Sequence, residues 1–358
     1  MKETSLYSSY ANLGAKILPY AGYKMPIQFS GVINECKTVR NDVGIFDLSH
    51  MGEIIIKGTN AFEFLQMMTT NNVEKLKEGN IQYTLLCNSQ GGIKDDCLLY
   101  KFLDYYILVV NAVNIEKIYL WLNENLAGDV IIENKSNFYS LIGIQGPLSF
   151  DLLTEVINEK KLLENLKYYS FLNLKINNIN VFCSRTGYTG ELGFEIYVEN
   201  NSALKIWDIF LKKGKLFNLK PIGLAARDTL RIEMKYSLYG NEINENIDPI
   251  QAGLKSIVDF SKDFIGKNKI LKLNKKNILR GIEVYGNAIP RKNTSIFKNN
   301  KKVGFVTSGT YSPSLKKPIA IIYILNKYSK INENIEVEIR NKKFSAKIIR
   351  TPFLKKNC

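Results

Sequence analysis

The stretch SRTGYTGELGFEIYV, residues 184–198, says most about how this chain folds. It contains three glycines at intervals of three residues, Gly187, Gly190 and Gly193, followed by a run of apolar residues. Phosphate-binding loops and dinucleotide-binding fingerprints have a different glycine spacing and lead into a helix, which this stretch does not. The pattern instead predicts a turn that enters a buried strand, with Phe194 and Glu195 on opposite faces of the sheet.

Around this stretch, helical and strand-like patterns alternate irregularly over residues 1–255. Apolar residues spaced three and four apart predict helices over residues 115–122 and 203–210. Asn60 with Glu63 resembles a capping box and predicts a helix over residues 60–68, and Gly146-Pro147 predicts the start of one over residues 147–166. Runs rich in strand-forming residues predict strands over residues 53–57, 96–102, 106–110, 139–144, 180–183 and 193–198. Because no regular strand–helix–strand repeat is present, these patterns predict an α+β fold with antiparallel sheets rather than a doubly wound fold.

The character of the sequence changes after the lysine-rich stretch 262–277. From residue 279 onward, strand patterns over residues 281–285, 303–307, 319–324, 335–340 and 344–349 alternate with turns, and no helical pattern is visible. The C-terminal part therefore predicts a small all-β domain, either a sandwich or a barrel.

The composition is that of a globular chain with a basic surface. The 358 residues are 45% hydrophobic and carry a formal net charge of +15, and a chain of this length divides into two or three domains. Lysine, asparagine and isoleucine are abundant throughout, so we attribute the charge to compositional drift. No basic cluster is interleaved with aromatic residues, as single-stranded nucleic acid binders require, and we expect no nucleic acid partner.

Cysteine and histidine usage limits the chemistry further. The five cysteines are scattered without C-x-x-C spacing, which indicates a reducing compartment and argues against a disulfide framework. His50 is the single histidine, so a histidine-containing cage is excluded and we expect no metal. The N-terminal residues show no targeting pattern, and no apolar run reaches about 18 residues, the length of a membrane span. We therefore expect a cytoplasmic protein without a membrane partner.

Three charged residues in apolar surroundings are candidates for a binding site. Asp95 and Asp96 follow the turn Gly91-Gly92 and, on a strand, point to opposite faces, so one can be solvated while the other reaches a pocket. The alternative is that the aspartate caps the turn, which is the commoner role for such a pattern. Glu195 either faces solvent or needs N–H donors or a cation. Arg227 needs an anion or a carbonyl, and both Glu195 and Asp228 are alternatives. Together these groups suit a ligand with N–H donors, a carbonyl and a reactive nitrogen, such as a reduced pterin.

Eight motifs in order along the chain resemble the aminomethyltransferase family, the T-proteins of the glycine cleavage system. They are FDLSHMGE (46–53), QYTLLCNSQGGIKDD (82–96), VVNAVNIEK (109–117), IGIQGP (142–147), SRTGYTGELGFEIYV (184–198), GLAARDTLRIE (223–233), YGNEINENIDPIQAGL (239–254) and TSGTYSPSLKKPIA (307–320). The resemblance covers nearly the whole chain. It implies a three-domain cloverleaf around a central folate cleft: a discontinuous first domain (1–52 and 150–255), a ferredoxin-like second domain (53–149) and a C-terminal β-barrel domain (279–358).

The resemblance also implies an activity and its partners. The expected enzyme transfers the methylene carbon from the aminomethyl-lipoyl arm of the H-protein to tetrahydrofolate, giving 5,10-methylenetetrahydrofolate, ammonia and the dihydrolipoyl H-protein. The lipoylated H-protein is the expected protein partner, and tetrahydrofolate is the expected cofactor. No other cofactor is expected.

Residue roles follow from the same resemblance. Asp96 is expected to be the key acid near N10 of the folate, Glu195 to hold the N–H edge of the pterin, and Arg227 to bind the folate. Four further residues match positions near the pocket: Met51, Tyr83, Asn111 and Tyr188. Many members of the family contact the folate tail from a longer C-terminus; here Lys355 or Lys356 is an alternative contact for the folate glutamate.

Two related activities fit the same fold. One is a folate-dependent demethylase, or the folate domain of a sarcosine-type oxidase, acting on free methylated substrates. The other is a non-catalytic folate-binding relative from iron–sulfur assembly, whose K-G-C-[YF]-x-G-Q segment contains a cysteine. Residues 184–198 have no cysteine, which argues against this second alternative.

Overall fold

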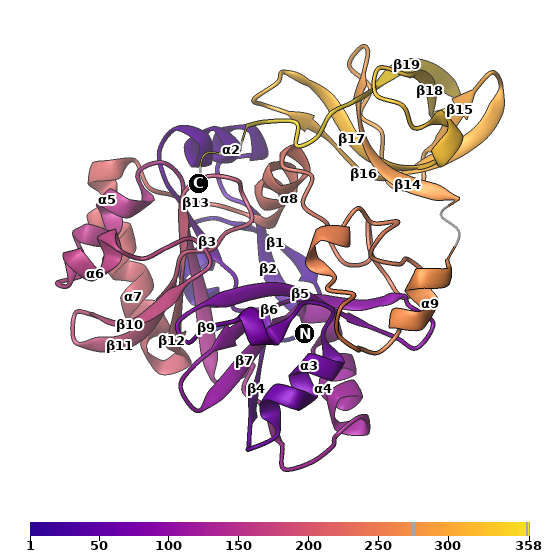
Figure 1. The fold of residues 1–358 in the computed structure, drawn as a ribbon. Coiled ribbons are helices and arrows are strands. Elements are labelled where there is room, and N and C mark those ends of the chain that lie inside the picture. Colours follow the sequence, from indigo (N-terminus) through magenta and orange to yellow (C-terminus); the bar gives the residue numbers. More distant parts are fainter. Residues whose placement is uncertain (274–275, 356, 358) are drawn as a thin grey trace.

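The computed structural model describes residues 1–273, 276–355 and 357, and its strands form two large sheets, a small hairpin and a closed barrel (Figure 1). The hairpin pairs β1 (Lys16–Tyr20) with β2 (Tyr23–Gln28). Helices combined with mainly antiparallel sheets confirm the predicted α+β class. The two sheets and the barrel form the three lobes of the predicted cloverleaf.

The first sheet has six strands. In order across the sheet they are β10 (Phe171–Ile176), β11 (Ile179–Ser184), β12 (Gly193–Glu199), β9 (Tyr139–Gln145), β3 (Gly44–Asp47) and β13 (Lys220–Pro221). The pair β13–β3 is parallel, whereas the other pairs of this sheet are antiparallel. Three helices belong to this lobe: α5 (Ser149–Thr154), α6 (Lys160–Glu164) and α7 (Asn200–Lys213).

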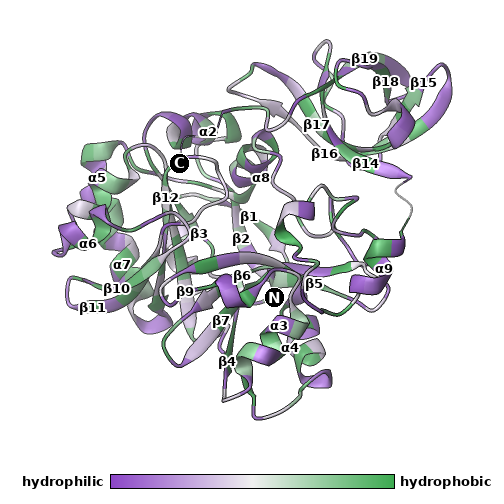
Figure 2. Ribbon diagram, viewed as in Figure 1, coloured by the Kyte–Doolittle hydropathy of each residue, from purple (hydrophilic) through white to green (hydrophobic). Residues whose placement is uncertain are grey.

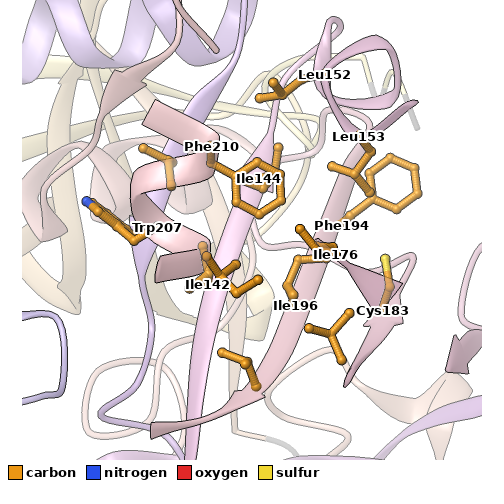
Figure 3. Packing of buried hydrophobic residues seen from close by; sticks show 14 of the residues in the cluster. Ile142, Ile144, Leu152, Leu153, Ile176, Cys183, Phe194, Ile196, Trp207 and Phe210 are labelled. Carbon is orange, nitrogen blue, oxygen red and sulfur yellow. The ribbon is translucent and has the colours of Figure 1, made fainter. Parts of the chain in front are cut away.

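One face of the first sheet packs against α7 (Figure 3). Phe194 and Ile196 on β12 are buried in the same hydrophobic cluster as Trp207 and Phe210 of α7. Since successive side chains of a strand point to opposite faces, Glu195 points away from this core. The alternation that builds the core therefore directs the carboxylate toward the second sheet.

The second sheet has five strands and two covering helices. The strands are, in order, β5 (Ile81–Cys87), β6 (Ile93–Lys101), β7 (Tyr105–Val110), β4 (Gly52–Lys57) and β8 (Ile131–Asn134). The helices are α3 (Ala61–Met68) and α4 (Ile115–Glu124). A cluster that includes Tyr100 and Val109 from this sheet, and Phe182 and Tyr197 from the first, joins the two sheets face to face. Any cavity between them is therefore walled by strands on both sides.

The C-terminal domain is a closed six-stranded barrel, which confirms the all-β prediction. Around the barrel the strands are β14 (Asn277–Val284), β17 (Lys317–Leu325), β16 (Lys301–Ser312), β15 (Ser295–Lys298), β18 (Asn334–Ile339) and β19 (Lys342–Ile349). A short helix, α9 (Lys267–Lys272), precedes it. Figure 2 shows hydrophobic residues concentrated along the strands and hydrophilic ones around α6 and α9. No helix within the described ranges has the length and apolar character that a membrane crossing requires.

The remaining helices are α1 (Tyr7–Asn12), α2 (Val32–Asn41) and α8 (Leu224–Glu233), and ion pairs of α2 and α8 join segments that are distant in the sequence. Arg40 at the end of α2 is half-enclosed between Glu191 and Glu233, at 2.8 and 2.6 Å. Arg231 of α8 is fully buried and lies 2.7 Å from Glu242. Removing one member of a buried ion pair costs about 3–5 kcal/mol, so these three pairs constrain where α8 lies.

Most predicted elements of residues 1–255 are present, with strand ends that agree within three residues. The continuous helix predicted over residues 147–166 is wrong, because α5 and α6 are separate. Between them Ile157 is buried and forms a backbone bridge to Ile176 on β10. A continuous helix would use that backbone group internally, so packing against the sheet interrupts the helix.

Strand β9 pairs with β3 and β12, although its residues fall within the range 53–149 that the sequence assigns to the second domain. Because a strand takes most of its backbone hydrogen bonds from its own sheet, we propose that the chain returns to the first domain near Tyr139 rather than at residue 150.

Glu53 on β4 is a buried carboxyl group whose ionisation should affect the stability of the fold. Its side chain is 1% exposed, and neither carboxyl oxygen has a hydrogen-bond partner within the described part of the chain. Burial raises the pKa of this carboxyl well above its ordinary value. The folded chain therefore holds a proton that the unfolded chain releases, and stability falls as the pH rises from the unfolded pKa toward the folded one.

We expect Glu53→Gln, which cannot ionise, to unfold at a higher temperature than the wild type at about pH 8, with a margin that narrows on acidification to about pH 4. Thermal unfolding of both proteins across this range measures the effect. Glu78→Gln, at an exposed position, is the control. A margin that does not depend on pH would contradict the prediction.

Candidate active site

The seven residues expected at the site line one cavity of about 550 Å³. They are Met51, Tyr83, Asp96, Asn111, Tyr188, Glu195 and Arg227. The cavity lies where the two sheets, α8 and the segment 235–257 meet. Its volume is within the range of about 300–1,000 Å³ that is typical of small-molecule sites.

Asp96 lies on β6 and faces this cavity rather than capping the preceding turn. Its Oδ2 accepts a hydrogen bond from the Tyr83 hydroxyl at 2.9 Å, and its Oδ1 accepts one from Asn111 Nδ2 at 2.8 Å. Burial raises the pKa of Asp96, whereas the hydrogen bonds from Tyr83 and Asn111 and the charge of Arg227 act in the opposite direction. The site thus places a carboxylate in a poorly solvated position and supplies two donors that favour its ionised form.

Asp95 points to the opposite face of β6, as the strand pattern predicts, but it is buried rather than solvated. Its carboxylate accepts hydrogen bonds from Asn114 Nδ2 at 2.6 Å and from the backbone and side chain of Asn111 at 3.0 and 2.8 Å. Burial and the neighbouring Asp96 charge raise the pKa of Asp95. Asn111 therefore bridges the two carboxyl groups, and Asp95 holds Asn111 in the orientation that serves Asp96.

The turn before β6 needs its glycines for a close backbone contact. A Cβ atom on Gly92 would lie 1.7 Å from the carbonyl oxygen of Glu245. The amide of Ile93 donates to the carbonyls of Asn244 and Ile247, at 3.1 and 3.0 Å. This contact brings the segment that follows α8 against the second sheet and closes one side of the cavity.

Glu195 is 9% exposed and is backed by a chain of hydroxyl groups. Its Oε2 accepts a hydrogen bond from Thr186, whose hydroxyl lies 2.8 Å from that of Ser184. Burial raises the pKa of Glu195, and Thr186 and Arg227 partly offset this effect. Its Oε1 accepts no hydrogen bond from the residues that the structure describes, which leaves it available to a ligand N–H.

The glycine-rich stretch wraps around one buried amide, that of Gln145. A Cβ on Gly187 or Gly193 would lie 2.0 or 2.3 Å from Gln145 Oε1, so both positions exclude a side chain. Gln145 Nε2 donates to the Thr186 carbonyl at 3.1 Å. Gly190 has a φ of +81°, which glycine adopts without steric penalty. These contacts fix the position of Thr186, and through it the orientation of Glu195.

Arg227 extends from α8 into the cavity without an ionic partner. Its guanidinium lies 4.5 Å from the ring centre of Tyr188, in cation–π contact. Within the described ranges it forms no ion pair or hydrogen bond. Asp228, one of its two alternative partners, instead pairs with Arg231 at 2.8 Å. Arg227 is therefore a cation held by an aromatic ring and free to bind a ligand.

A second cavity, of about 440 Å³, adjoins the first. The two share five lining residues: Met51, Asn111, Tyr188, Arg227 and Leu238. His50 lines the second cavity, and burial together with the charge of Arg227 lowers the pKa of His50 to about 3. The imidazole is therefore neutral at physiological pH. Arg227 and Asn111 line both cavities, so two reactants bound in separate cavities could meet beside them.

Sequence reasoning missed several residues of the site. Gln145 lies in the motif IGIQGP but has no charge to draw attention to it. Lys235, Ser256 and Ile257 line the cavity outside the quoted motifs, and Ala252 and Leu254 line it from the end of the motif 239–254 without having been singled out. Cys97 also lines it, and burial raises the pKa of this thiol well above its ordinary value, which disfavours the thiolate form. Across the described residues, no group of three or more metal-ligating side chains is arranged to hold a metal.

Comparisons with known proteins agree with this geometry along the whole chain. A family model described as the GCVT N-terminal domain matches residues 6–262, and one described as the glycine cleavage T-protein C-terminal barrel domain matches residues 278–355. The aminomethyltransferase of Caldanaerobacter subterraneus subsp. tengcongensis is 47% identical over 365 residues, covering 100% of this chain and 97% of that protein. That of Chloroherpeton thalassium is 44% identical and covers 100% of both chains.

A solved structure extends the likeness to three dimensions. The crystal structure of glycine cleavage system aminomethyltransferase T from Bartonella henselae matches with a TM-score of 0.92 at 28% identity, covering 99% of each chain. Two family models, relatives of matching length and a shared fold lead to one assignment. The chain belongs to the aminomethyltransferase family of the glycine cleavage system.

Proposed function

We propose that this chain transfers the methylene carbon of an aminomethyl group, carried on the lipoyl arm of the H-protein, to tetrahydrofolate in the larger cavity. One observation carries the proposal: seven residues from distant parts of the sequence line a single cavity of suitable volume. The residues fit a reduced pterin because Glu195 offers an unoccupied acceptor and Arg227 an unpaired cation. Tetrahydrofolate supplies the nitrogen nucleophiles that accept the carbon.

In this proposal Glu195 and Arg227 hold the pterin. A carboxylate suits the parallel N–H donors of a pterin edge, and Thr186 keeps that carboxylate in place. Arg227 is positioned to meet a carbonyl or anionic group of the ligand. Met51 and Tyr188 contribute apolar and aromatic surface to the same cavity. The role of these residues is to bind and orient, which can accelerate a transfer strongly without new chemistry.

Asp96 supports the chemical step. The transferring carbon gains positive character as it leaves its amine, and a nearby carboxylate stabilises that charge most effectively where water is scarce. Tyr83 and Asn111 keep the carboxylate ionised and oriented. Folate filling the cavity would also exclude water, which would otherwise release the carbon as formaldehyde.

The second cavity gives the protein-bound arm a separate approach. It meets the larger cavity at Asn111 and Arg227, so a lipoyl arm entering there would bring its terminal carbon toward Asp96. An acidic carrier would suit a chain with a net charge of +15. Neither nucleic acid nor a membrane has a part in this scheme, and a cytoplasmic location remains a prediction.

The test is a transfer assay with tetrahydrofolate and either aminomethyl-lipoyl H-protein or a free methylated amine as donor. We expect 5,10-methylenetetrahydrofolate and ammonia from the H-protein alone. Product from a free methylated amine alone would support the demethylase alternative. Tetrahydrofolate binding without transfer from either donor would support a non-catalytic role.

Asp96→Asn is expected to lower turnover by roughly 100-fold or more, because a neutral amide cannot stabilise the developing charge. Unfolding temperature should change little, since the amide retains the shape of the carboxyl group. Steady-state kinetics and thermal unfolding measure the two effects. Asp95→Asn is the matched control and should reduce stability more than Asp96→Asn does. Near-normal turnover by Asp96→Asn would remove Asp96 from its proposed role.

Tyr83→Phe removes a donor that favours the Asp96 carboxylate, so the pKa of Asp96 should rise. The acidic limb of the pH–rate profile should then move to higher pH, because the carboxylate is protonated sooner as the pH falls. The value of kcat/KM on the alkaline plateau should change less than its value on the acidic limb. Profiles of kcat/KM for Tyr83→Phe and for Tyr285→Phe, on the barrel surface, provide the comparison. An unshifted limb would contradict the assignment.

Glu195→Gln should weaken tetrahydrofolate binding by roughly 10- to 100-fold, since it replaces a charge-assisted acceptor with a neutral amide. The unfolding temperature of Glu195→Gln should fall by less than the unfolding temperature of Glu191→Gln, because the second substitution disrupts the ion pair with Arg40. Calorimetric titration gives the affinity and thermal unfolding the stability. A large stability loss with unchanged affinity would assign Glu195 a structural role instead.

A further inference from the structure

Lys235 lines the larger cavity in an unusual backbone conformation. It follows the end of α8 and has a φ of +55°, in the left-handed region that disfavours residues with a side chain. Asparagine is common in this region, but lysine is not. The same conformation occurs at other residues, Lys316 among them, so it is the place of Lys235 at the cavity wall that points to a ligand.

The ammonium group of Lys235 is not neutralised by the described residues. A Cβ atom on Gly253 would lie 3.3 Å from its Nζ, so the ammonium lies beside a segment whose neighbours Ala252 and Leu254 also line the cavity. It forms no hydrogen bond or ion pair with any part of the chain that the structure describes. Burial and the neighbouring charge of Arg280 lower the pKa of Lys235, and the charge of Glu242 offsets this effect only in part. An anionic ligand would relieve the remaining cost.

Three other cations that are largely buried have ionic or polar partners among the described residues. Arg40 contacts two carboxylates and Arg231 contacts Glu242 and Asp228. Lys262 donates to two backbone carbonyls. Arg227 and Lys235 both line the same cavity without an ionic partner in the described ranges. The two unpaired cations therefore mark two places where a ligand can present negative charge or a carbonyl.

Arg227 is the fourth residue of α8 and Lys235 lies two residues beyond its end, so the two cations come to the cavity from different ends of this segment. Such an arrangement suits a long ligand with different ends. We propose that Lys235 binds the carboxylates of the glutamyl tail of the folate while Glu195 and Arg227 hold the pterin. The inference rests on the proposed function, because it identifies a further contact to the same ligand. Lys355 is an exposed alternative contact, and Lys356 lies outside the described residues.

The test uses two substitutions and a matched control. Lys235→Asn removes the cation and suits the left-handed backbone, whereas Lys235→Arg retains the positive charge. Lys316→Asn is the control, because Lys316 also has a φ of +55° but lies exposed in a barrel turn. Dissociation constants are measured for tetrahydrofolate and for 6-methyltetrahydropterin, which lacks the p-aminobenzoylglutamate tail. Thermal unfolding of each variant confirms that it folds.

We expect Lys235→Asn to weaken tetrahydrofolate binding by roughly tenfold and to leave 6-methyltetrahydropterin binding unchanged. Lys235→Arg should restore most of the affinity, and Lys316→Asn should behave as the wild type with both ligands. If Lys235 has only a structural role, Lys235→Asn should weaken the binding of tetrahydrofolate and of 6-methyltetrahydropterin equally. That outcome would overturn the inference. Unchanged tetrahydrofolate binding by Lys235→Asn would also overturn it while leaving the proposed function intact. Absence of tetrahydrofolate binding by the wild type would overturn both.

Discussion

The position of helix α8 depends on two buried arginines, and the cavity depends on that helix. Arg40 links α8 to the glycine-rich stretch through Glu233 and Glu191, and Arg231 links it to Glu242 and to the barrel residue Ser308. Desolvating such charges is costly unless each donor has an acceptor, and here each guanidinium has several. The ion pairs therefore constrain the relative placement of three segments that are distant in the sequence. Arg227 and Lys235, at the start and beyond the end of α8, take their positions from this arrangement.

Charged residues that stabilise the fold differ from those that line the site in whether they have ionic partners. Arg40 and Arg231 are fully paired, so their burial stabilises one arrangement of the lobes. Arg227 and Lys235 lack ionic partners in the described ranges, and Oε1 of Glu195 accepts no hydrogen bond there. Such groups lower stability in the free protein, and a ligand that satisfies them recovers that free energy as affinity. A site of this kind selects a ligand by where its donors and acceptors lie, as a pterin with an anionic tail would present them.

The local spacing of apolar residues predicted much of this fold. It failed where contacts between distant segments determine the backbone conformation. Alternation predicted β12 and the opposite orientations of Phe194 and Glu195, because strand periodicity is a local property. The helix predicted over residues 147–166 was interrupted where Ile157 pairs with β10. The pattern placed Asp95 and Asp96 on opposite faces but did not reveal that Asn111 joins them. Gln145 escaped notice because its role comes from glycines that approach it from another part of the chain.

The amino-acid sequence by itself determined the class of fold, the β character of the C-terminal domain, the resemblance to a family and the seven candidate residues. Each of these is encoded in short-range periodicity or in motifs that can be recognised one at a time. Only the tertiary structure decided that these residues share one cavity, that Asp228 pairs with Arg231 rather than with Arg227, and that Lys235 lines the same wall. The reason is physical: whether a charge is paired or left available depends on which distant segments pack against it, and that packing is a property of the whole chain.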